Sequence, residues 1–490
     1  MKQICSLFVF IAACACSTYS PDEGVMQEVD RATETPMTFE AASGDSVTAF
    51  EGSFTVPENR ANPQSRILTL RYVRFPATGD AAGPPIIYLA GGPGGSGIQT
   101  AKGRRFPLFM AMREFGDVIA FDQRGTGASN DLPNCVSSQY SPDDAELSDS
   151  AFLEMQKEAF KECLAFWKSE GVDVRGYNTL ESVADLDALR EALGAEAISL
   201  WGISYGSHLS LAALKDIDAN IDRIVIASAE GLDQTIKLPA RTDAYFKRLQ
   251  DAINTQPAAK EMFSDIIGLM RHVHAQLEEE PLMLQIPQSD GSSSPYLFHR
   301  RDMQRIASAM ISDPQSASML IQLYGAIAAG MTDPVAGLVS RFHTPNEPIS
   351  YSPMSVLMDV SSGTGAERRE LIEEQARTSL LASFLNQPVE LEDVDPSLVL
   401  GDEFRKAPVS DTPILVLSGT LDGRTYVESQ HEAVSGLRNR QMITVVNAGH
   451  NLFMASPEVT EAIQRFMRGE TLKKNEIIVE LPDFSSIPGR

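Results

Sequence analysis

The segment Gly202-Ile203-Ser204-Tyr205-Gly206 places a serine between two glycines, directly after a short apolar run at 197–201. Glycines two residues before and two residues after a serine permit a tight turn from a strand into a helix. Such a turn projects the serine oxygen outward and points the positive end of the helix at it. A serine hydroxyl is a poor nucleophile unless a base takes its proton and an acid orients that base. The segment therefore predicts a catalytic serine, Ser204, if both partners follow.

Both partners occur downstream, each after a predicted strand. The apolar run 414–417 leads into Asp422, and the run 442–446 leads into His450. Strands that end at the same edge of a sheet would bring Ser204, Asp422 and His450 together, in the chain order serine, aspartate, histidine. The other histidines follow no predicted strand; they are His208, His272, His274, His299, His343 and His431. We therefore predict a triad of Ser204, Asp422 and His450.

A glycine-rich turn at 90–97 follows the apolar run 86–89 and could supply a backbone amide to the reaction. The negative oxygen of an acyl-transfer intermediate needs two such donors. One is expected from the residue after the nucleophile, Tyr205, and the other from this turn. Glycines suit the second position because a backbone without side chains can approach a substrate carbonyl closely.

The same turn has a competing interpretation. Gly92, Gly94 and Gly97 fit the GxGxxG pattern of dinucleotide-binding proteins, and Asp122 ends the next strand, where a ribose ligand would lie. Against it, Pro93 removes one amide from the loop. We therefore favour the oxyanion turn. The following segment, Asp122-Gln123-Arg124-Gly125-Thr126-Gly127, is interpreted as a structural turn in which an aspartate and an arginine fix the loop beside the site.

The elements that must position these residues alternate between strands and helices. A helix is predicted at 182–193, where apolar residues recur at helical spacing and Gly194 ends the pattern. Such alternation predicts an α/β fold with a mostly parallel sheet flanked by helices. The predicted strands lie at 47–56, 67–73, 86–90, 118–122, 197–201, 224–227, 414–417 and 442–446.

One long interval breaks the alternation. From 231 to 409 the pattern is mostly helical, with methionine, leucine and alanine at helical periods and almost no strand signal. An insertion of this length between two strands predicts a large helical cap over the strand ends. The expected organisation is a signal peptide at 1–17, a tether at 18–45, a hydrolase-like core at 46–230, the cap at 231–409 and the rest of the core at 410–490.

The N-terminus predicts export. Lys2 precedes an apolar run at 4–13, which is too short to span a bilayer as a helix. The sequence Ile11-Ala12-Ala13-Cys14 resembles a bacterial lipoprotein signal, in which Cys14 would carry the lipid that anchors the chain to a membrane. The alternative is an ordinary signal peptide cleaved after a small residue. In both cases the mature chain is expected in the periplasm or the cell envelope.

Composition limits the partners and cofactors. Lys and Arg number 41 against 66 Asp and Glu, a net charge of −25, which disfavours binding to nucleic acid or to an anionic membrane surface. Outside the N-terminal region only Cys135 and Cys163 remain, and an isolated pair in an oxidising compartment predicts a disulfide. Neither cysteine has the spacing of a zinc site, so we expect no metal.

Five motifs together carry a family resemblance: Leu89-Ala90-Gly91-Gly92-Pro93-Gly94, Asp122-Gln123-Arg124-Gly125-Thr126-Gly127, Gly202-Ile203-Ser204-Tyr205-Gly206, Gly419-Thr420-Leu421-Asp422 and Gly449-His450. In this order they resemble the prolyl and tripeptidyl aminopeptidases of the α/β-hydrolase fold, over most of 45–230 and 405–470. Ala90 stands where prolyl aminopeptidases usually carry histidine, which is nearer the tripeptidyl branch.

The resemblance implies an exported serine exopeptidase that needs no cofactor and acts on peptides with a free N-terminus. Ser204 would be the nucleophile, His450 the base and Asp422 its orienter, and the amide of Gly91 would join that of Tyr205 in the oxyanion hole. An esterase or lipase on the same triad is the first alternative. A catalytically silent binding protein of the same fold is the second.

An exopeptidase must also hold the ammonium group of its substrate, and a partly desolvated cation needs carboxylates around it. Glu230 and Asp233 follow the strand after the nucleophile helix and are the candidates. Asp359 is interpreted instead as a helix cap. Glu278-Glu279-Glu280 is interpreted as a solvated helix end.

Overall fold

The computed structural model describes residues 32–80, 83–130, 132–288, 290–386 and 389–486. In these residues one ten-stranded sheet runs through the molecule in the order β1-β2-β3-β5-β4-β7-β8-β12-β13-β14. The strands are β1 (Thr33–Glu40), β2 (Ser46–Pro57), β3 (Ile67–Phe75), β4 (Ile86–Leu89), β5 (Val118–Asp122), β7 (Ile198–Ile203), β8 (Ile221–Ala227), β12 (Ile414–Gly419), β13 (Arg440–Val446) and β14 (Glu476–Ile478).

The sheet has an antiparallel part and a parallel part. Strands β1, β2, β3 and β5 pair antiparallel, and every pair from β5 through β4 to β14 is parallel. All residues of β4, β5, β7 and β12 are buried, as expected for parallel strands covered on both faces. This arrangement confirms the predicted α/β class.

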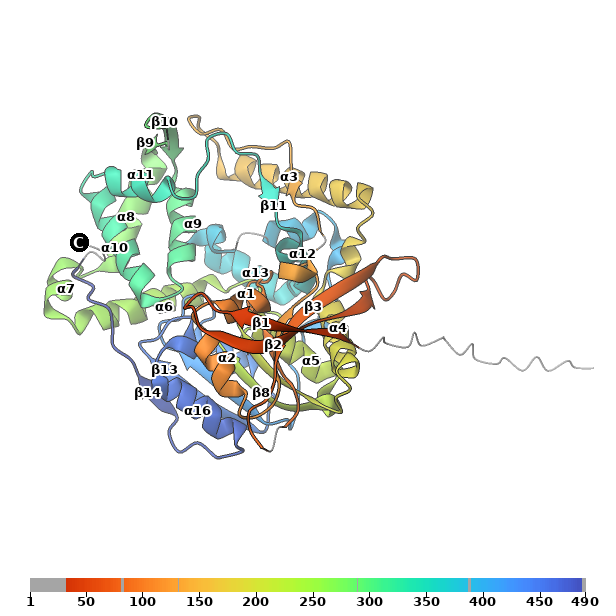
Figure 1. Ribbon diagram of the computed structural model, residues 1–490. Helices are drawn as coiled ribbons and strands as arrows, with labels where there is room; N and C mark the ends of the chain where they lie inside the picture. The colour runs from red at the N-terminus through yellow and green to blue at the C-terminus, as the bar shows by residue number, and fades with distance from the viewer. Residues whose placement is uncertain (1–31, 81–82, 131, 289, 387–388, 487–490) are drawn as a thin grey trace, which may run out of the picture.

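Helices cover the two faces of the sheet (Figure 1). The residues on each face form a separate apolar cluster. On one face α2 (Phe106–Met112) and α16 (Pro457–Met467) pack against the strands. On the other face lie α3 (Asp149–Ser169), α4 (Thr179–Ala192) and α5 (Tyr205–Asp216). The predicted helix at 182–193 is the larger part of α4, and α5 begins directly after Ser204.

The folded part begins earlier than the sequence indicates. Strand β1 lies inside the segment 18–45, for which the acidic composition predicts a tether. One of those acids, Glu34, accepts a hydrogen bond from Arg74 Nε at 2.8 Å, and Phe39 is fully buried. The tether prediction is therefore corrected for residues 33–45: the charge there belongs to an ion pair within the sheet. Residues 1–31, including the predicted signal and Cys14, lie outside the described residues.

The segment 231–409 is mostly helical and lies above the sheet in Figure 1. Much of it shares one apolar cluster with Leu421, Tyr426 and Phe484, while apolar residues at 354–360 belong to a cluster that packs on the sheet. The segment also contains a hairpin, β9 (Leu282–Pro287) and β10 (Ser293–Phe298), which corrects the expectation of almost no strands. The missed signal is Asp290-Gly291, a typical hairpin turn, with Gly291 at φ 86°. The helices are α6 (Pro239–Asn254), α7 (Pro257–Met262), α8 (Ile266–Glu279), α9 (Arg300–Met310), α10 (Pro314–Ala328), α11 (Asp333–Val339), α12 (Pro353–Ser362), α13 (Ala366–Ala376) and α14 (Asp402–Arg405).

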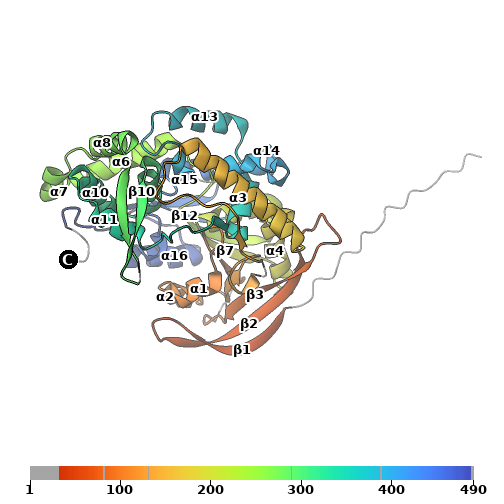
Figure 2. The same cartoon turned by 90° about the horizontal axis from the view of Figure 1, so that it is seen from above.

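A segment that precedes Ser204 in the chain packs against this helical region. The short strand β6 (Cys135–Val136) pairs with β11 (Ser350–Tyr351), and α3 runs beside the region in Figure 2. Tyr351 donates a hydrogen bond to the Gln156 carbonyl oxygen of α3 at 3.0 Å. In space, therefore, the layer above the sheet includes part of residues 46–230 as well as residues 231–409.

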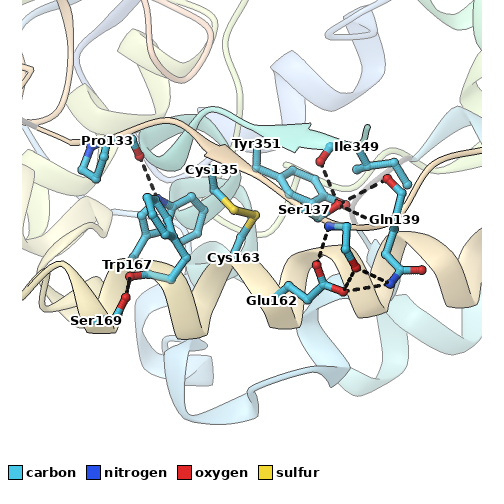
Figure 3. Close-up of a disulfide and its surroundings, with 12 residues drawn as sticks. Pro133, Cys135, Ser137, Gln139, Glu162, Cys163, Trp167, Ser169, Ile349 and Tyr351 are labelled. Carbon is cyan, nitrogen blue, oxygen red and sulfur yellow. Dashed lines mark hydrogen bonds between the residues drawn. A yellow bond between two sulfur atoms is a disulfide. The ribbon is translucent and has the colours of Figure 1, made fainter. Parts of the chain in front are cut away.

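A disulfide joins Cys135 to Cys163 of α3, as the sequence predicts (Figure 3). Both cysteines are buried. Next to the bond, Trp167 donates its indole N–H to the Pro133 carbonyl oxygen at 3.0 Å. The disulfide holds β6, which pairs with β11, against the long helix α3.

No helix in the described part of the chain is long and apolar enough to cross a bilayer.

Loss of the disulfide is expected to lower stability. Because Cys135 and Cys163 are 28 residues apart, the chain-entropy estimate gives a loss of about 3–4 kcal/mol in the free energy of unfolding. Urea unfolding of the oxidised protein and of the variant Cys135→Ser/Cys163→Ser measures this difference. Two free thiols in the unreduced native protein, seen by mass spectrometry, would contradict the bond itself.

Candidate active site

Ser204 lies at the turn between β7 and α5 and has a strained backbone, with φ 54° and ψ −125°. Gly202 and Gly206 must be glycines, because neighbouring backbone atoms lie where a Cβ would be. A Cβ on Gly206 would lie 2.1 Å from the Leu89 carbonyl oxygen, and one on Gly202 would lie 2.4 Å from the Gly206 carbonyl oxygen. The GxSxG spacing therefore reflects three backbone segments packed more closely than side chains permit.

Asp422 follows β12 and is completely buried among hydrogen-bond donors. Its Oδ1 accepts from the backbone amides of Arg424 at 2.8 Å and Thr425 at 2.9 Å, and its Oδ2 accepts from the Thr425 hydroxyl at 2.7 Å. Burial by itself would raise the pKa of Asp422. The attraction of His450 and the donors of His450 and Thr425 outweigh burial, so the pKa lies below its ordinary value. Asp422 is therefore a fixed carboxylate rather than a proton carrier.

His450 follows β13 and turns its Nδ1 toward Asp422, at 3.0 Å from Oδ2 and 3.1 Å from Oδ1. This contact orients the ring and leaves Nε2 for another partner. The backbone is held from two sides, because the His450 amide donates to the Ser312 carbonyl oxygen at 2.7 Å and the Ser228 hydroxyl donates to the His450 carbonyl oxygen at 2.8 Å. The arrangement allows His450 to act as a base directed by Asp422.

Among the rival histidines, His208 lies within α5, the helix that begins directly after Ser204. It is fully buried, and its Nδ1 is 3.2 Å from the Gly231 carbonyl oxygen. Burial lowers the pKa of His208. These contacts are those of a neutral core histidine.

The turn after β4 brings Gly91 against the serine. A Cβ built on Gly91 would lie 3.1 Å from Ser204 Cβ and 3.0 Å from the Ile203 carbonyl oxygen. The turn is closed by a hydrogen bond from the Gly95 amide to the Gly91 carbonyl oxygen at 3.0 Å. Gly91 and the start of α5 at Tyr205 therefore flank Ser204, which is where two oxyanion donors would have to be.

Asp122 joins the two glycine-rich turns. Its Oδ1 accepts from the Ser96 hydroxyl at 2.6 Å and the Ile98 amide at 3.0 Å, and its Oδ2 accepts from the Ala128 amide at 2.8 Å. A carboxylate engaged in this way is not open to a ribose. The contacts favour the structural interpretation of this turn over the dinucleotide one.

Arg124 anchors the second turn from below. It is fully buried and its Nε and Nη2 both lie 2.7 Å from the carboxylate of Asp185 in α4. Its Nη1 also donates to the carbonyl oxygens of Glu58 and Gly176. Such a two-pronged buried pair fixes the position of the loop geometrically.

A cavity of about 1150 Å³ opens above Ser204 and His450. Its walls come from the glycine turn after β4, from the segment after β8 and from the helical region, including α9, α11 and α12. The volume exceeds the usual range of small-ligand sites, about 300–1,000 Å³. The cavity can therefore enclose several amino-acid residues.

Buried charges line one part of this cavity. Glu230 accepts a hydrogen bond from Lys237 Nζ at 2.7 Å. Burial alone would raise the pKa of Glu230, but the positive charge and the hydrogen bond of Lys237 hold it below its ordinary value. Asp359 lies deep in the protein with part of its side chain open to the cavity; burial, together with the negative charge of Glu230, raises its pKa to about 7.

The structure thus separates the acids that the sequence grouped. Glu230 lines the cavity, but Asp233 lies outside its walls and is half-exposed, with its Oδ2 3.6 Å from Arg368 Nη1. Asp359 is within α12 and not at its end, so its interpretation as a helix cap is wrong. Sequence reasoning also missed Lys237, which pairs with Glu230, seven residues earlier in the chain.

The described residues contain no group of three or more histidine, cysteine, aspartate or glutamate side chains placed to hold a metal ion.

Residues 84–457 match the family described as alpha/beta hydrolase fold. The chain belongs to this family. Among curated proteins it is similar to Serine protease Hip1 of Mycobacterium tuberculosis, at 32% identity over 36% of this chain and 35% of that protein. It is also similar to Tripeptidyl aminopeptidase of Streptomyces lividans, at 28% identity over 36% of this chain and 34% of that protein. The matched part of the chain thus spans about a third of the length of these relatives.

Among solved structures, the alpha/beta hydrolase chain is similar to proline iminopeptidase of Mycobacterium smegmatis. The sequence identity is 14%, the TM-score is 0.38, and the match covers 85% of this chain and 98% of the other.

Substitution of Gly206 by alanine tests the close packing at the serine turn. The new Cβ would meet the Leu89 carbonyl oxygen at 2.1 Å, and because both groups belong to the backbone we expect a loss of about 3 kcal/mol or more in stability. Gly337→Ala in α11 is the matched control, since a Cβ there has no neighbour within 4 Å. Chemical denaturation measures both variants, and wild-type stability of Gly206→Ala would contradict the packing argument.

Proposed function

We propose that this alpha/beta hydrolase is a serine peptidase that removes residues from the free N-terminus of peptides. The observation that carries the proposal is one cavity that is lined by Ser204 and His450 and also by the buried carboxyl groups of Glu230 and Asp359. The first pair suits acyl transfer, and the second pair suits a substrate ammonium group. The names of the two curated relatives, a serine protease and a tripeptidyl aminopeptidase, support the same chemistry.

In the proposed reaction His450 takes the proton of the Ser204 hydroxyl, and the serine oxygen attacks the carbonyl carbon of the scissile amide. The amides of Gly91 and Tyr205 stabilise the negative oxygen that forms. His450 then gives its proton to the leaving amine, and water repeats the sequence to release the acyl group. Asp422 stays ionised throughout and stabilises the charged imidazole.

The carboxyl groups of Glu230 and Asp359 would make the proposed enzyme select substrates with a free amine. When Asp359 is protonated, Glu230 and Lys237 cancel and the trio has no net charge; when it is ionised, the trio carries one negative charge. A substrate ammonium group would supply the missing positive charge inside the cavity. An acetylated N-terminus would bring no charge and would leave Asp359 without compensation.

We also propose that the chain is exported and that Cys14 carries a lipid anchor. The apolar run at 4–13 and the sequence around Cys14 support this. The Cys135–Cys163 disulfide supports an oxidising compartment.

The triad is tested with the mature chain on fluorogenic tripeptide amides that have free or acetylated N-termini, and on a short-chain ester. We expect cleavage of the free-amine amides, with kcat reduced about 10⁴-fold or more in Ser204→Ala and about 10⁴-fold in Asp422→Asn. Turnover of the ester alone would assign the same site to an esterase. Failure of Ser204 to react with a serine-directed phosphonate would instead favour a non-catalytic protein.

Substitution of Asp359 by asparagine tests amine binding. Because a hydrogen bond to a charged group contributes about 1.5–3 kcal/mol, we expect KM for free-amine amides to rise about 10- to 100-fold at pH 8, with kcat nearly unchanged. In the wild type KM should rise as the pH falls below about 7, since Asp359 then becomes neutral; Asp359→Asn should lose this dependence. Asp233→Asn, outside the cavity, is the control, and equal KM values in all three proteins would place the amine elsewhere.

A further inference from the structure

Arg105 brings a positive charge into the cavity from the residue before α2. It lines the cavity together with Tyr88 and His450. Its Nη1 donates to the Tyr88 hydroxyl, and its Nη2 donates to Asn451 Oδ1 at 2.7 Å. The guanidinium also lies over the rings of Tyr88 and Phe453, at 5.8 and 5.6 Å from their centres. The group is thus held in place by a hydroxyl, an amide oxygen and two aromatic rings.

Arg105 differs in one respect from two other cationic side chains of the cavity. Lys237 pairs with Glu230 at 2.7 Å, and Arg305 lies 4.0 Å from Asp302. Arg424 instead donates its Nη1 to the Ser308 carbonyl oxygen at 3.1 Å. Among the described residues, no aspartate or glutamate oxygen lies within 4.0 Å of an Arg105 nitrogen. The charge of Arg105 is therefore open to a carboxylate from outside.

Arg105 lies on the side of the cavity that would hold the leaving part of the substrate, the part released with the new amine. Asn451, which accepts its hydrogen bond, is the residue directly after His450. The catalytic histidine delivers its proton to the leaving amine, so the leaving part of the peptide must lie on the histidine side of the serine. The proposed amine site at Glu230 and Asp359 is formed by other elements, the segment after β8 and α12.

We propose that Arg105 binds a carboxylate of the leaving part of the substrate and so gives the enzyme a preference for short or acidic peptides. The proposal rests on the proposed function. Two sources share this chemistry: the C-terminal carboxylate of a short peptide, and an aspartate or glutamate side chain just after the scissile bond. Arginine has five donors in a planar fork that matches a carboxylate, and the hydrogen bonds of Arg105 to other described residues engage only two of its nitrogens.

The test compares peptides that differ only at the leaving end. Free-amine tetrapeptides are offered to the mature chain as C-terminal acids and as C-terminal amides, and product release is followed by mass spectrometry. The quantity measured is the ratio of kcat/KM for the acid to kcat/KM for the amide. This ratio cancels any general loss of catalysis or of folded protein in a variant.

We expect a ratio of about ten or more in the wild type, falling to about one in Arg105→Gln and to an intermediate value in Arg105→Lys, which keeps the charge but loses the fork. Arg104→Gln is the matched control, because Arg104 is exposed and lies outside the cavity walls; it should keep the wild-type ratio. A second set, amidated peptides with aspartate or asparagine after the scissile bond, shows whether a side-chain carboxylate is accepted in place of the C-terminal one.

A wild-type ratio near one in both peptide sets, or a ratio that Arg105→Gln leaves unchanged, would overturn the proposal. Fluorogenic tripeptide amides contain no carboxylate on the leaving side, so their hydrolysis reports on the proposed function by itself. Cleavage of these amides without any preference among the peptides would therefore reject the role of Arg105 alone. Absence of all amide cleavage would reject both.

Discussion

The contact between the start of α5 and the turn after β4 is the constraint on which the site depends. With only a hydrogen at Gly206, the helix approaches the Leu89 carbonyl oxygen to a distance that excludes any side chain. This approach holds Ser204 at a positive φ angle and places Gly91 against it. Such strain costs of order 1–3 kcal/mol and persists only where the surroundings enforce it. Here the fully buried strands β4 and β7 provide the enforcement.

The helical region above the sheet helps to hold the proposed catalytic groups as well as to form the cavity. Between α9 and α10, the Ile311 carbonyl oxygen accepts from the Gly423 amide at 3.0 Å, and the Ser312 carbonyl oxygen accepts from the His450 amide at 2.7 Å. The turns that carry Asp422 and His450 are thus both bonded to the same short connection. Core and insertion together form the proposed active site, although nearly 200 residues of sequence separate the two groups of core strands.

Much of the fold, and the grouping of Ser204, Asp422 and His450, could be predicted because the signals are local. Ser204, Asp422 and His450 each follow an apolar run, and parallel strands end at one edge of the sheet, so order along the chain was enough to group them. The residues of the proposed amine site could not be grouped in this way. Asp233 and Asp359 are both acids in the insertion, and only tertiary packing places Asp359 in the cavity and Asp233 beside Arg368. Similarly, Glu34 lies in the sheet, where it pairs with Arg74 of another strand. The acidic sequence around Glu34 gives no sign of this distant partner.

The connection at Ile311 and Ser312 has a consequence for how relatives of this chain can diversify. Mutations in α12 can reshape the cavity while the backbone of His450 keeps its hydrogen bond to Ser312. Mutations at the connection change the cavity wall and the histidine position together, because Gly449 already packs against Asp313 with no room for a side chain. New specificities should therefore arise on the α12 wall, while lineages that alter the α9–α10 connection should need compensating changes in the histidine loop.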